Sequence, residues 1–132
     1  MSDPITPPAA RWPSEAAELV SLAVSDGDLG AAVAQYEDAA TLRPWADDRQ
    51  GGHDVTETMA AILELRLPLD TRLVAVLPAD GLTMLVCERS IEGAGPDGKQ
   101  VRLHGTGCTV VRPQQDGSWR IAADAWQLTD TS

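Results

Sequence analysis

The apolar residues of this sequence change their spacing once, near Pro68, and this change rules out most fold classes. Before Pro68 they recur every three or four residues, which is the period of a helix with one buried side. After Pro68 they alternate with polar residues, which is the period of a strand. Helices followed by consecutive strands with short turns favour two packed layers. We therefore predict an α+β domain in which two or three N-terminal helices pack on a curved antiparallel sheet.

Each predicted helix follows a residue that can cap its first turn: Ser14, Asp28 and Asp54. The buried side of the first helix is expected to hold Ala16, Leu19, Val20, Ala23 and Val24. The second helix is expected to bury Leu29, Ala32, Val33 and Tyr36, and the third Val55, Met59, Ile62 and Leu63. Between these two helices we predict a short strand at 40–43 and a loop at 44–52.

Four longer strands are predicted at 71–77, 82–91, 100–112 and 118–128, separated by turn-forming sequences rich in Gly, Pro and Asp. One core is expected to unite the helices with one side of these strands: Leu19, Val20, Val33, Ile62, Leu73, Val86, Val110 and Ile121. The strands around 82–86 and 101–111 have apolar or neutral residues on both sides, more than one helical layer can cover. This excess of apolar surface predicts a homodimer.

The 132 residues suit a single domain. Prolines crowd the start of the chain, so residues 1–13 are expected to form a flexible tail ahead of a domain at 14–130. The net charge of −10 repels a phosphate backbone, which argues against nucleic acid as a partner. No export signal or apolar run of membrane-spanning length is visible, so we expect a cytoplasmic protein without a membrane partner. Cys87 and Cys108 then read as reduced thiols packed as small apolar groups.

Two apparent motifs do not predict chemistry. The segment 93–99 matches GxxxxGK, but Gln100 replaces the Ser or Thr that holds magnesium, and a strand follows where a helix is needed. His104 and Cys108 are four residues apart on a strand, about 13 Å, too far to share one zinc ion. His53 precedes a helix start and is expected to be exposed. No metal and no cofactor are therefore expected.

Asp124 is the polar residue with the most informative surroundings, because it stands among apolar residues in the segment 121–126 of the last strand. Its carboxylate either turns outward to solvent or lies in a pocket, where it could transfer a proton. The sequence leaves both possibilities open, since the side of the strand that faces the core is not fixed by alternation alone.

Several segments, in this order, resemble the nuclear transport factor two-like superfamily, especially its SnoaL-like polyketide cyclase and ketosteroid isomerase-like branches. They are 25–29 and 36–42 near the first strand, 98–106 at a hairpin, 116–121, and the Asp124-x-Trp126-x-x-x-Asp130 ending. The resemblance spans residues 14–130. It implies a cone-shaped fold with an apolar pocket and frequent homodimers. Because this family includes isomerases, cyclases, hydrolases and non-catalytic association domains, it does not imply one activity.

The resemblance also assigns candidate site residues, with departures. The two acids of ketosteroid isomerases would fall at Pro44 and near Cys108 or Thr109, so isomerase chemistry of that type is not expected. An epoxide hydrolase set is matched by Arg89 and Asp124, but its third member falls on Ile91.

A SnoaL-like acid/base role fits Asp124, with His104 as its polar partner. The expected substrate-binding residues are Tyr36, Trp45, Arg89 and Trp126. Two functions follow: an enzyme of the cyclase, isomerase or hydrolase kind acting on an apolar, polyketide-like molecule by acid/base catalysis, or a non-catalytic ligand-binding or dimerisation module.

Overall fold

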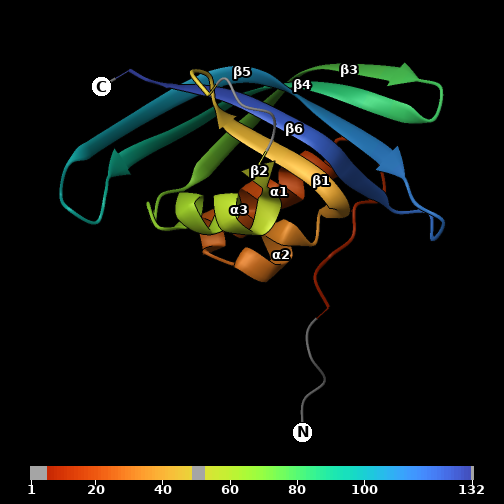
Figure 1. The fold of residues 1–132 in the computed structure, drawn as a ribbon, viewed down its shortest axis with the longest axis horizontal. Helices are drawn as coiled ribbons and strands as arrows, with labels where there is room; N and C mark the ends of the chain where they lie inside the picture. The colour runs from red at the N-terminus through yellow and green to blue at the C-terminus, as the bar shows by residue number, and fades with distance from the viewer. Residues whose placement is uncertain (1–5, 49–52, 132) are drawn as a thin grey trace, which may run out of the picture.

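The computed structural model describes residues 6–48 and 53–131 (Figure 1). Its helices are α1 (Glu15–Asp26), α2 (Leu29–Val33) and α3 (Val55–Leu63). Its strands are β1 (Tyr36–Trp45), β2 (His53–Asp54), β3 (Leu69–Ala79), β4 (Leu82–Ala94), β5 (Gln100–Pro113) and β6 (Trp119–Asp130). The predicted α+β class is confirmed: β1, longer than the strand predicted at 40–43, and β2 lie between α2 and α3, and the four meander strands follow the helices.

Two of the three predicted helix caps form as expected. The carboxylates of Asp28 and Asp54 accept hydrogen bonds of 3.0 Å from the backbone N–H of Ala31 and Glu57. Ser14 takes the capping position of α1 but its side chain makes no capping bond. Tyr36 is buried as predicted, but its assignment to the second helix was wrong: it is the first residue of β1, since α2 ends at Val33.

The six strands form one sheet in the order β2-β1-β6-β5-β4-β3. Strands β3 to β6 make the predicted antiparallel meander. Strand β1 departs from the predicted antiparallel sheet, because it pairs with β6 in parallel. Helix α3 connects the β1 and β2 edge of the sheet to β3 at the other edge, and the meander then returns to place β6 beside β1. Figure 1 shows the three helices lying together on one side of the curved sheet, so that only one side of the sheet faces the core.

Two glycines of β5 allow the close packing of β5 on β6. A Cβ atom at Gly107 would clash with the carbonyl oxygen of Ala125, and one at Gly105 would clash with that of Gln127. Gln127 itself has a positive φ of 58°, which interrupts the regular strand. The regular pairing of β5 with β6 is therefore interrupted at this point, next to the buried Trp126.

The core lies between the helices and the inner side of the sheet. Val20, Ile62 and Ile121 are buried as predicted, and Leu19 and Val33 pack partly buried against them. The predictions for Leu73, Val86 and Val110 were wrong. The inward residues of β4 and β5 are those of the opposite alternation: Thr83, Leu85, Cys87, Arg89 and Ile91 on β4, and Leu103, Thr109 and Val111 on β5. A shift of one residue exchanges the two sides of a strand, so the errors for Val86 and Val110 share one cause.

Leu73 is 42% exposed on the edge strand β3, whose pairing with β4 shifts register between Leu73 and Ala75. The described residues of the N-terminal segment contact the domain. Ala10 is buried and pairs with Trp119, and the side chain of Gln35 donates a hydrogen bond of 2.7 Å to the carbonyl of Pro8. The division of the chain at residue 13 stays a prediction.

Candidate functional site

Five inward-facing side chains from four strands meet in the core, and we call them the Asp124 cluster. They are Tyr36 of β1, Arg89 of β4, Thr109 of β5, and Asp124 and Trp126 of β6. The strand register explains why they meet. Thr109 pairs with Asp124 across β5 and β6, and Trp126 follows two residues later on the same side.

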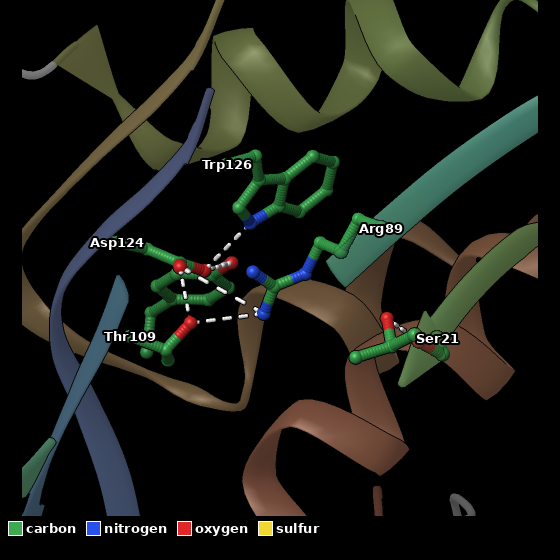
Figure 2. Close-up of polar contacts among 7 residues, drawn as sticks. Ser21, Arg89, Thr109, Asp124 and Trp126 are labelled. Atoms are coloured by element: carbon green, nitrogen blue, oxygen red, sulfur yellow. Dashed lines mark hydrogen bonds and ion pairs between the residues drawn. The ribbon is translucent and has the colours of Figure 1, made fainter. Parts of the chain in front are cut away.

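The carboxylate of Asp124 accepts three hydrogen bonds (Figure 2). The hydroxyl of Thr109 donates to Oδ1 at 2.6 Å, while the phenol of Tyr36 and the indole N–H of Trp126 donate to Oδ2 at 2.7 and 2.9 Å. Of the two orientations that the sequence left open, Asp124 has the inward one, with no side-chain exposure. Both carboxylate oxygens therefore accept hydrogen bonds from protein donors.

Arg89 brings a positive charge beside this carboxylate. Its Nη2 donates to the hydroxyl of Thr109 at 2.9 Å and lies 3.9 Å from Asp124 Oδ1, and its guanidinium sits 5.2 Å from the ring centre of Trp126. Nε and Nη1 of Arg89 are buried and have no hydrogen-bond partner in the described part of the chain. A buried guanidinium with two nitrogens that make no hydrogen bond is uncommon, since each unmade hydrogen bond costs about 1 to 3 kcal/mol.

Two groups have raised pKa values here, Tyr36 within the cluster and Cys87 beside it. Burial, together with the negative charge of Asp124 and the hydrogen bond to it, raises the pKa of Tyr36 well above its usual 10.0. Burial likewise raises the pKa of the Cys87 thiol, which keeps it a small neutral group as expected. Tyr36 therefore remains a hydrogen-bond donor over the whole physiological pH range.

Four of the six predicted site residues meet in this cluster: Tyr36, Arg89, Asp124 and Trp126. His104 and Asp124 are not brought together. His104 projects from the opposite side of β5, is half exposed, and contacts Glu92 at 2.7 Å through Nε2. Trp45 lies apart at the end of β1 and is 38% exposed.

Two neighbouring cavities share Trp45 and Leu65. The larger, the Leu128 pocket, has a volume of about 470 Å³ and is lined by Trp45, Asp47, Leu65, Val101, Leu103, Leu128, Thr129 and Asp130. The smaller, the Trp45 pocket, has about 280 Å³ and is lined by Pro44, Trp45, Asp48, His53, Thr58, Ala61, Ile62 and Leu65. Asp124 lines neither of them. The cluster is thus separated from these cavities by other side chains.

Sequence reasoning missed two features. Thr109 links Arg89 to Asp124, and no sequence signal marks it, because the alternation does not fix which side of β5 faces inward. The side chain of His53 is 39% exposed, and it also pairs with Asp48 through Nε2 and lines the Trp45 pocket, which the sequence did not indicate. Asp48 follows β1 and His53 begins β2, so their contact depends on how β2 lies beside β1. Within residues 6–48 and 53–131, no group of three or more His, Cys, Asp or Glu side chains could hold a metal ion, and no helix is long and apolar enough to span a membrane.

No protein-family model matches this sequence, and no curated protein sequence does. Solved structures do match its fold. A ketosteroid isomerase-like protein from Erwinia carotovora atroseptica SCRI1043 is 15% identical with a TM-score of 0.73, over 90% of this chain and 93% of that one.

An NTF-2-like protein from Shewanella oneidensis MR-1 is 18% identical with a TM-score of 0.63, over 84% and 92%. A Δ5-3-ketosteroid isomerase from a Mycobacterium species is 17% identical with a TM-score of 0.60, over 89% and 96%. The fold of this chain is therefore the fold of the ketosteroid isomerase-like and NTF-2-like proteins.

Proposed function

We propose that the protein is a small-molecule enzyme of the cyclase, isomerase or hydrolase kind, with Asp124 as its acid/base and an apolar molecule with an oxygen function as its substrate. One observation carries the proposal: a carboxylate and a guanidinium lie buried together, 3.9 Å apart, in a largely apolar core. A buried ion pair contributes little to stability, because removing both charges from water costs as much as their attraction returns. Such a pair, when it also leaves N–H groups unused, is typical of a functional centre.

The unused N–H groups of Arg89 give the substrate a place to bind. A carbonyl, enolate or epoxide oxygen accepts hydrogen bonds from them, and the positive charge stabilises negative charge that develops on that oxygen. Asp124 takes a proton from the substrate, or from a water that attacks it, and returns the proton to the product. Tyr36 and Thr109 keep donating to the carboxylate and hold it in place during this exchange.

The apolar part of the substrate is assigned to the Leu128 pocket. Leu128, Trp126 and Asp124 follow one another at two-residue intervals on the inward side of β6, so Trp126 stands between this pocket and the carboxylate. A substrate that enters the pocket meets Asp124 only when the indole of Trp126 moves aside. The expected role of Trp126 is therefore to control access to the carboxylate and to stack on the substrate.

Turnover of a small panel tests this function: cyclic enones for isomerisation, epoxides for hydrolysis and poly-β-ketones for cyclisation, followed by chromatography and mass spectrometry. For a compound that is converted, Asp124→Asn should lower the rate by about 100-fold or more while binding persists. Asp80→Asn, a matched change at an exposed hairpin residue, should leave the rate unchanged. Conversion that survives in Asp124→Asn would contradict the assignment.

A non-catalytic ligand-binding module is the second candidate, and one observation favours it. Both oxygens of Asp124 already accept hydrogen bonds, and neither pocket beside Trp45 is lined by the carboxylate. In that case the cluster is a rigid support for the sheet, and ligands stay in the pockets. Compounds that bind but are never converted would favour this function over the enzyme.

A further inference from the structure

The Trp45 pocket contains a polar pair that the function proposed above does not use. His53, on the short strand β2, and Asp48, beyond the end of β1, contact each other through Nε2 and a carboxylate oxygen. Both line the pocket. Their side chains are 39% and 20% exposed, so the pair lies at the rim and not in the core.

The remaining lining of this pocket is largely apolar. Helix α3 supplies Ala61 and Ile62, Leu65 follows it, and Pro44 and Trp45 come from β1. A volume of about 280 Å³ accommodates a molecule of one or two fused rings. The indole of Trp45 offers such a molecule a flat surface for stacking.

The pair determines which nitrogen of His53 donates a hydrogen bond and which one accepts. The Asp48 carboxylate is an acceptor only, so the nitrogen of His53 that faces it carries the proton. In the neutral imidazole the other nitrogen, Nδ1, is then a hydrogen-bond acceptor. A carboxylate-oriented histidine fixed in one tautomer is the arrangement that recognises an N–H or O–H group of a ligand.

We propose that the Trp45 pocket is a binding site for a flat, mostly apolar molecule that carries one hydrogen-bond donor, with His53 accepting from that donor, Asp48 fixing the tautomer of His53, and Trp45 stacking on the ring. This inference uses the same region of the fold as the proposed function but not its chemistry. The pocket binds such a molecule whether or not Asp124 catalyses a reaction.

Indole and 1-methylindole form a matched pair of probes, because the methyl group removes the N–H donor and little else. The test is a titration of isotope-labelled protein with each probe, followed by NMR at the indole signal of Trp45. Indole should shift this signal and bind about fivefold or more tightly than 1-methylindole, as expected for one additional hydrogen bond to His53.

The preference for indole should disappear in His53→Leu and shrink in Asp48→Asn, which leaves the imidazole in place but frees its tautomer. Asp124→Asn should keep the preference, which separates this site from the proposed catalytic centre. Equal affinity of the two probes, a preference that survives His53→Leu, or stronger binding of benzoate than of indole would each overturn the inference. A failure of catalysis in the compound panel would leave it standing.

Discussion

At the scale of single residues, Asp124 is held by donors from three strands, β1, β5 and β6. Each donor replaces a hydrogen bond that water would make to an exposed carboxylate, and Arg89 adds a positive charge nearby. Desolvation of the carboxylate is therefore largely offset inside the fold. The unused groups are on Arg89, which is why the substrate oxygen is assigned to Arg89 and not to Asp124.

The only tyrosine of the sequence allows a direct test of this cluster by absorbance. Because the pKa of Tyr36 is raised in the folded state, the unfolded chain loses this proton near pH 10.0 while the folded chain keeps it. The contribution of Tyr36 to stability is complete below pH 10.0 and is lost as pH rises through the raised folded value. Tyrosinate absorbance of the folded protein should stay absent at pH 10.0 and appear only with unfolding. Ordinary titration without unfolding would place Tyr36 outside the core.

Some residues of the site could be predicted from the sequence, because they interrupt the pattern of a single strand. Asp124 and Trp126 stand out because a carboxylate and an indole interrupt an apolar strand. His104 was expected to be the partner of Asp124 but lies on the other side of β5. The sequence could not show this, because it depends on which side of β5 faces inward. The pairing of Asp48 with His53 depends on how the chain returns beside β1, which no local pattern encodes.

At the scale of secondary structure, the caps and periods placed α1, α3 and the four meander strands close to their observed positions. The side of each strand was harder to place, because β4 and β5 have apolar residues in both alternations. Val86 and Val110 are as apolar as the buried Leu85 and Val111, so composition alone does not separate them. The helices decide, and they cover only one side.

The contact of β5 with β6 predicts a strong effect of one methyl group. Gly107→Ala places a Cβ against the carbonyl of Ala125, so we expect a loss of about 2 kcal/mol or more in the free energy of unfolding. Gly30→Ala is the control, because a Cβ there meets only the Asp28 side chain at an ordinary 3.7 Å. It should be neutral or stabilise α2 by up to about 1 kcal/mol. Urea unfolding of both variants measures the difference, and equal stability would contradict the close packing.

At the scale of the whole molecule, the outer side of the sheet is left uncovered by the helices (Figure 1). Met84, Val86 and Val110 lie on this side and are half buried by their neighbours, and Cys108 and Ala123 are exposed there. An apolar face of this kind is covered by a partner in many proteins. We therefore retain the homodimer as a proposal, with this face as its interface.

Sedimentation at micromolar concentration tests the dimer, which should have twice the 14.0 kDa chain mass. Val86→Lys puts a charge on the outer side without touching the core and should shift the protein to the monomer mass with little loss of stability. Thr56→Lys, at an exposed position on α3, is a control that should leave the mass unchanged. A wild-type monomer, or a dimer that tolerates Val86→Lys, would exclude this interface.

The indole N–H signal of Trp126 reports whether a small molecule reaches the Asp124 cluster. That proton is bonded to Asp124 at 2.9 Å, so any substrate that displaces the indole or takes a hydrogen bond from Arg89 must move its signal. For a compound that the protein converts, we expect the Trp126 signal to shift in step with occupancy in Asp124→Asn, where the compound binds without turnover. A converted compound that shifts the Trp45 signal but leaves Trp126 unmoved would place the chemistry outside the cluster and contradict the account.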